Sequence, residues 1–194
     1  MIHRFSVDTV VLPDVSCLPE ADLIEPLNEL FSRASRGEQK IRRVAAGDEL
    51  SMGEAKFEIL NPPFPGYSDA KLNDTSIVMK MTLWETTVLF TGDIGEKVEF
   101  RLIEEYGERL HCDFLKISHH GIVYQNHLRF FQAVSPRLAV AQNLRPEGVF
   151  MRVLRQVLEE HHGLPEENFF FTGRDGRLRA AIGKNGIEFY RQFD

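Results

Sequence analysis

Two strand-like segments of this chain end in polar residues that can bind metal, and this pairing constrains the fold more than any other feature. The segments are LFTGD at 89–93 and ISHHG at 117–121, each an apolar run followed by polar residues and a glycine. Between them Val98, Leu102 and Tyr106 recur at helical spacing. The order strand, helix, strand over this length predicts a crossover between two neighbouring parallel strands.

Such a crossover brings Asp93 and the pair His119 and His120 to the same edge of the sheet, where open α/β sheets bind their ligands. A carboxylate and a neutral imidazole are ordinary ligands for zinc, manganese or iron. Gly92 and Gly121 would let the backbone turn sharply next to an ion. Because successive residues of an extended segment point to opposite sides, we expect the two histidines to do different jobs.

A second His-His-Gly, at 161–163, provides a control within the same chain. It ends an amphipathic helix, where histidines favour the helix dipole and Gly163 acts as a cap, so we interpret it as helix-end chemistry. A Gly-Asp after a strand is also a common turn. His3, His111 and His127 lack comparable context and are interpreted as surface or helix-start residues. Only the conjunction of LFTGD with ISHHG favours a functional interpretation.

The rest of the chain reads as alternating strands and helices without a repeat or linker, so we expect one domain over residues 1–194. A loop is predicted at 61–74, which contains three prolines and a glycine. Helices are predicted from Leu23, from about Val98 and over 149–158. Strands are predicted at 7–13, 41–60 (several short ones), 75–83, 86–93, 113–118, 137–142, 168–172, 178–182 and 187–192.

Composition limits the function classes. The chain is 43% hydrophobic and 27% charged, as expected for an ordinary soluble globular protein, and no apolar run approaches a membrane span. A net charge of −6 gives no overall basic surface, so a nucleic-acid substrate would need a local basic patch or a metal. Cys17 and Cys112 match no zinc or disulfide pattern and are predicted to be free thiols.

Four ordered segments resemble the metallo-β-lactamase-like domain of ComEC-type competence proteins, which are membrane proteins that bring DNA into bacteria. The segments are NDTSIVMKM (73–81), VLFTGD (88–93), DFLKISHHG (113–121) and VSPRLAVA (134–141). The closing FFFTGRDGRLRAAI (169–182) is also similar to the end of that domain. The resemblance runs over nearly the whole chain.

This resemblance implies an α/β (α+β) fold, the four-layer αββα sandwich, with metal bound at the sheet edge. It implies that Asp93, His119 and His120 are catalytic and bind metal, and that Asn73 and Ser76 line the substrate site. The cofactor would be zinc or manganese, and the reaction hydrolysis of a DNA phosphodiester by a metal-activated water. The implied partners are DNA and a membrane channel region of the same protein, with this domain outside the cytoplasm.

The chain also departs from the family pattern. The main ligand motif, His-x-His-x-Asp-His, is absent, and LPEADL at 18–23 could supply at most two of its ligands. The segment 143–148 lacks a histidine that the family tends to have, and Ile122 stands where serine is usual. We therefore expect a fragment that begins downstream of the motif, whose exposed first-sheet remnant would favour a homodimer. Two classes stay open: a metal-dependent hydrolase, or an inactive, metal-poor relative that serves as a binding or assembly module.

Overall fold

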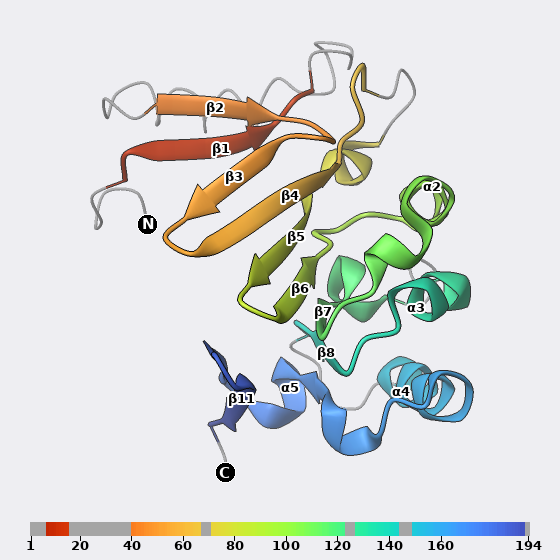
Figure 1. The fold of residues 1–194 in the computed structure, drawn as a ribbon. Coiled ribbons are helices and arrows are strands. Elements are labelled where there is room, and N and C mark those ends of the chain that lie inside the picture. Colours follow the sequence, from red (N-terminus) through yellow and green to blue (C-terminus); the bar gives the residue numbers. More distant parts are fainter. Residues whose placement is uncertain (1–6, 16–39, 67–70, 123–126, 144–148, 193–194) are drawn as a thin grey trace.

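The computed structural model describes residues 7–15, 40–66, 71–122, 127–143 and 149–192. Its centre is a seven-stranded sheet in the order β3-β4-β5-β6-β7-β8-β9 (Figure 1). Neighbours from β3 to β6 are antiparallel, whereas β6, β7, β8 and β9 run parallel to one another. The strands are β3 (Glu49–Met52), β4 (Ala55–Asn61), β5 (Val78–Leu83), β6 (Thr86–Phe90), β7 (Phe114–Lys116), β8 (Leu138–Ala141) and β9 (Phe169–Phe171).

Three helices cover one face of this sheet (Figure 1): α2 (Glu96–Tyr106), α3 (Leu128–Val134) and α4 (Val149–His162). Each helix turns an apolar stripe toward the sheet, as the helical spacing predicted for α2 and α4. The core between helices and strands contains Leu89, Val98, Leu102, Phe130, Phe131, Leu154 and Leu158. Burying these side chains removes them from water and provides the main stabilisation of this layer.

The opposite face of the sheet is covered in part by a hairpin of β10 (Leu178–Gly183) and β11 (Gly186–Arg191). Phe189 stacks on Phe170 with ring centroids 4.6 Å apart, and its ring lies edge-on to Phe114 at 5.3 Å. Helices, sheet and hairpin give the helix–sheet–sheet order that the predicted αββα sandwich requires. The helix predicted from Leu23 lies outside the described residues, as does LPEADL.

A separate parallel pair, β1 (Thr9–Pro13) and β2 (Lys40–Val44), lies beside β3, where Arg42 donates to the Glu49 carbonyl at 2.9 Å. Cys112 is buried and free, as predicted, and its burial raises the pKa of its thiol to about 12. The remaining short elements are η2 (Leu72–Thr75), η3 (Gly107–Leu110), η4 (Ser118–Gly121), η6 (Glu166–Asn168) and α5 (Thr172–Asp175).

The crossover prediction is confirmed, because α2 connects β6 to its parallel neighbour β7. The strand predictions are confirmed, with strand ends that differ from the predicted ones by at most three residues. His127 does start a helix, as the N-cap of α3. Sequence reasoning missed α3 itself, and η2 forms at the end of the segment 61–74 that was predicted to be a loop. None of the helices that the structure describes is long and apolar enough to span a membrane.

Candidate functional site

Asp93 and the His119–His120 pair meet at the carboxyl ends of β6 and β7. Oδ2 of Asp93 lies 3.6 Å from Nε2 of His120. Nδ1 of His119 lies 3.2 Å from the backbone carbonyl oxygen of Asp93. The prediction that the crossover brings a carboxylate and an imidazole to one edge is therefore confirmed as geometry.

The hydrogen bond on the far side of the His120 ring fixes its tautomer. Nδ1 of His120 lies 2.8 Å from the carbonyl oxygen of Gln142, which follows β8. Because a carbonyl only accepts, this nitrogen carries a hydrogen. In the neutral ring Nε2 then presents a lone pair toward Asp93, whereas in the imidazolium form Nε2 donates a hydrogen to that carboxylate. Two acceptors that face each other need a proton or a cation between them. In a tetrahedral zinc site, bonds of about 2.0–2.1 Å place two ligands about 3.4 Å apart, close to this pair.

The histidine pair occupies a left-handed turn. The φ angles are 45° for His119, 56° for His120 and 79° for Gly121. The expectation of an extended segment was therefore wrong, since β7 ends at Lys116, and the pair lies in the short helix η4. The two rings still have different partners and lie at 84° to each other. Consecutive left-handed L-residues cost about 1–2 kcal/mol each, so surrounding contacts must hold them in place.

Lys116, the last residue of β7, supplies a cation that sequence reasoning missed. Its Nζ donates to the Gly92 carbonyl at 2.6 Å and lies 3.5 Å from Oδ1 of Asp93. Burial lowers the pKa of the ammonium, while the neighbouring Asp93 carboxylate opposes that shift. One oxygen of Asp93 thus faces an ammonium and the other faces His120. The available signal was a lysine inside the apolar strand pattern DFLKIS.

The NDTS segment forms another wall of the site. Oγ of Ser76 accepts from the Asp93 backbone N–H at 3.2 Å, and the Asn73 side-chain nitrogen lies 3.4 Å from Nδ1 of His119. Gly92 has φ +57°, and a Cβ built there would lie 2.6 Å from Cβ of Ser76. Only glycine permits this approach, which brings the loop that carries Asp93 onto the segment that carries Ser76.

Asn61 anchors this wall from within the core and was also missed from the sequence. Its amide nitrogen donates to the carbonyls of Asp74 at 2.8 Å and Ser76 at 2.7 Å. Its amide oxygen accepts from Arg101 of α2 at 2.7 Å. Asn61 is fully buried, so these bonds satisfy an amide that would otherwise destabilise the fold. The sequence offered only its place before two prolines.

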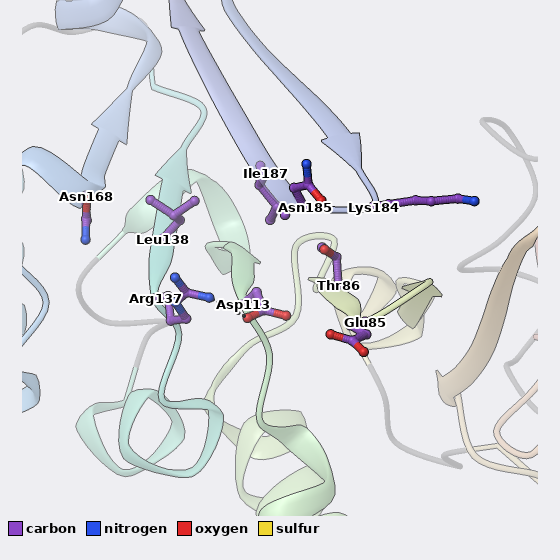
Figure 2. A pocket seen from close by; sticks show the side chains of 10 residues that line it. Glu85, Thr86, Asp113, Arg137, Leu138, Asn168, Lys184, Asn185 and Ile187 are labelled. Atoms are coloured by element: carbon purple, nitrogen blue, oxygen red, sulfur yellow. Dashed lines mark hydrogen bonds and ion pairs between the residues drawn. The ribbon is translucent and has the colours of Figure 1, made fainter.

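Two cavities flank the parallel strands. One, of about 460 Å³, lies between the sheet and the β10–β11 hairpin and adjoins the site, because Gly92, Lys116 and Gln142 are part of its lining. The other lies at the amino ends of the strands, and Figure 2 shows Asp113, Arg137 and other charged side chains around it. The first is mainly apolar beyond its rim, and the second is polar.

Asp93 and His120 are two side chains that lie close enough to share an ion. Within residues 7–15, 40–66, 71–122, 127–143 and 149–192, no three His, Cys, Asp or Glu side chains gather as a metal-binding group. A catalytic zinc normally has three protein ligands, and Lys116 already lies against the second oxygen of Asp93. The described residues therefore do not fit a pair of ions bridged by Asp93.

Comparison with known proteins agrees with the resemblance in the motifs. The chain is 28% identical over 141 residues to the competence protein ComA of Neisseria gonorrhoeae, covering 70% of this chain and 19% of ComA. It is 30% identical over 83 residues to the uncharacterized protein YcaI of Escherichia coli, covering 43% of this chain and 11% of YcaI. The chain thus spans a fifth or less of these curated relatives. No family model matches it.

Among solved structures, the chain is similar to CmlA of Streptomyces venezuelae, a diiron β-hydroxylase. The match has a TM-score of 0.54 at 17% identity and covers 94% of this chain and 40% of CmlA. A structure of the CmlA E377D mutant gives a TM-score of 0.55 at 14% identity. At this identity the likeness shows the fold alone, which is a metallo-β-lactamase fold. The fold class predicted from the sequence is confirmed, and so is the resemblance to a ComEC-type domain.

Proposed function

We propose that this chain is part of a metal-dependent hydrolase that cleaves DNA phosphodiesters, with its reaction centre at Asp93 and His120. The observation that carries the proposal is that Oδ2 of Asp93 and Nε2 of His120 face each other 3.6 Å apart, while Nδ1 of the same ring is bound to the Gln142 carbonyl. The similarity to a competence protein supports DNA as the substrate.

In this proposal Asp93 and His120 hold one zinc or manganese ion. Such an ion supplies an activated water and neutralises charge on a phosphate oxygen. Lys116 keeps the Asp93 carboxylate oriented and adds a positive charge beside it. His119 has its Nδ1 turned to the Asp93 carbonyl, so its Nε2 is the atom available to an ion or a substrate.

Asn73 and Ser76 would line the path of the substrate in the same proposal. Ser76 also supports the loop by accepting from the Asp93 backbone N–H. The net charge of −6 requires that phosphate be attracted locally, and Lys116 with a bound ion provides that local charge. The resemblance to the ComEC-type domain extends the proposal to a membrane channel region of the same protein, with this domain outside the cytoplasm.

The test is a DNA cleavage assay with manganese or zinc, on the wild-type chain, Asp93→Asn and the matched control Asp113→Asn. Asp113 lies at the opposite end of the parallel strands, so its variant should cleave like the wild type. Asp93→Asn should lose both cleavage and ion binding by calorimetry. Equal cleavage by the wild type and Asp93→Asn would remove the site from the mechanism.

A second candidate is a binding or assembly module without catalysis. The observation that favours it is the two-donor set among the described residues, one short of an ordinary catalytic zinc site. This candidate predicts that the chain binds DNA or a second copy of itself without cleaving DNA under any ion. Light scattering tests the homodimer, and a clean monomer would exclude self-assembly.

A further inference from the structure

Glu99 in the first turn of α2 is a fully buried carboxylate that joins two points of the chain on either side of the histidine pair. Its Oε1 accepts from Oγ of Ser118 at 2.8 Å, directly before His119. Its Oε2 accepts from the backbone N–H of His127 at 2.7 Å, where α3 begins. One side chain thus fixes both the entry to the histidine turn and the start of the next helix.

The surroundings of His127 strengthen this connection. Nε2 of His127 lies 3.8 Å from Oε1 of Glu96, and its ring centroid is 4.6 Å from that of Phe100. Its Nδ1 accepts from the Arg129 backbone N–H and caps α3. The first turn of α2 therefore holds the amino end of α3, and Glu99 adds the link to Ser118.

Stability does not explain a carboxylate at this position. Burial raises the pKa of Glu99 to about 7, although the bonds from His127 and Ser118 oppose that shift. A well-packed apolar residue usually stabilises such a position as well as a buried charge or better. Meanwhile His119 and His120 hold left-handed φ angles that persist only under external restraint. Ser118, next to the strained pair, is the residue that Glu99 restrains.

We propose that Glu99 is a positioning residue that holds His119 and His120 in their left-handed turn, so that Nε2 of His120 faces Asp93. The consequence for catalysis rests on the proposed function. The geometric claim does not, because the tautomer of His120 can be measured without metal, substrate or activity. In the wild type, the bond to Gln142 requires the Nδ1–H form.

Two substitutions separate positioning from packing. In Glu99→Gln, the amide oxygen can accept from His127 N–H while the amide nitrogen donates to Oγ of Ser118, because a hydroxyl both donates and accepts. Both links then survive. Glu99→Leu keeps an apolar volume of similar size and removes both links. If Glu99 only filled space, the Glu99→Leu variant would keep the histidine turn at least as well as the Glu99→Gln variant.

The measurement is the nitrogen chemical shifts of the His120 ring at pH 8 in the metal-free chain. The wild type and Glu99→Gln should show the Nδ1–H tautomer, and Glu99→Leu should lose it. Manganese affinity, measured by calorimetry, should be about 10- to 100-fold weaker in Glu99→Leu and restored in Glu99→Gln. A folded Glu99→Leu variant with the wild-type His120 tautomer would overturn the proposal.

Ser118→Ala keeps the test decisive if Glu99→Leu does not fold. It removes the link between Glu99 and the histidine turn and leaves the bond from Glu99 to His127 N–H in place. The proposal expects a loss of the Nδ1–H signature of His120 in this variant too, and an unchanged signature would overturn it. Absence of DNA cleavage in all variants, with the tautomer results as expected, would instead contradict the proposed function alone.

Discussion

Asp113 and Asp93 are two partly exposed aspartates at opposite ends of the same pair of parallel strands, and their surroundings differ. Asp113 accepts from the backbone N–H of Thr87 at 2.9 Å and from its hydroxyl at 3.1 Å, with Arg137 at 3.4 Å. Asp93 has Lys116 at 3.5 Å and a histidine nitrogen at 3.6 Å. The first carboxylate has short bonds, and the second has only long ones.

This difference favours a structural role for Asp113 and makes Asp93 the candidate for a functional one. The bonds of Asp113 fix where β7 starts against β6, and the charges around its cavity are of both signs (Figure 2). Asp93 instead lies beside a strained histidine turn, with Nε2 of His120 facing its carboxylate at 3.6 Å. Strain and unmatched acceptors persist where they are used, so the carboxyl edge is the better candidate for chemistry.

The largest expected effect is the loss of DNA cleavage in the Asp93→Asn variant. The amide keeps the shape but removes the charge that would hold an ion. An ion contributes several kcal/mol to charge stabilisation, so cleavage should fall by about 1,000-fold. The melting temperature should change little, because no short bond to this carboxylate is lost. A calorimetric titration with manganese checks the mechanism, and unchanged affinity would refute it.

The next effect concerns the pH dependence of stability. Glu99 has a folded pKa of about 7 against an ordinary value of 4.5, so between these values the folded state binds the extra proton. Its contribution is therefore present below about pH 4.5 and is lost as the pH rises toward 7. Glu99→Gln does not titrate, so its stability relative to the wild type should rise by up to about 3 kcal/mol between pH 5 and 8. Urea unfolding of both proteins at the lower and the higher of these pH values measures the difference in their free energies of unfolding. A difference independent of pH would contradict it.

The contrast between the two aspartates was only half visible in the sequence. The apolar spacing around Val98 and Leu102 predicted α2, and a strand on each side of it fixed the parallel crossover. That topology alone placed Asp93 near the histidine pair. The approximate position of a residue can therefore be predicted from the sequence when it follows a strand that a crossover of ordinary length connects to its neighbour.

The supporting residues escaped prediction for physical reasons. Gln142 acts through its backbone carbonyl, which every residue has. Glu99 follows Val98 in a helix that also carries exposed charges. From the sequence alone, its buried carboxyl cannot be told from the charged residues on the solvent side. Lys116 lies two residues after Phe114 on the face of β7 that the hairpin covers, and its long side chain brings the ammonium to Asp93. The left-handed turn at His120 had no signal beyond the following glycine.

A third prediction tests the structural side of the comparison. Asp113→Ala leaves the Thr87 backbone N–H without its acceptor, and an unsatisfied buried donor costs about 1–3 kcal/mol. Because the side chain of Asp113 is 27% exposed, water replaces part of the loss, and we expect about 1–2 kcal/mol. Denaturant unfolding measures the change. Manganese affinity should stay as in the wild type, and a loss there would mean that the two ends of the strands are coupled.

The smallest expected effect is that of Arg137→Ala, which divides the surroundings of Asp113 further. The Arg137 side chain is 82% exposed and lies 3.4 Å from Oδ1, so its ion pair is screened by water and should contribute less than about 0.5 kcal/mol. The two bonds from Thr87 would then account for nearly all of the stabilisation that Asp113 gives. A double-mutant cycle of Asp113→Ala with Arg137→Ala measures the coupling directly. A coupling above about 1 kcal/mol would show that Asp113 stabilises the fold through Arg137 rather than through Thr87. Both aspartates would then depend on a neighbouring cation, and the contrast between Asp113 and Asp93 would be lost.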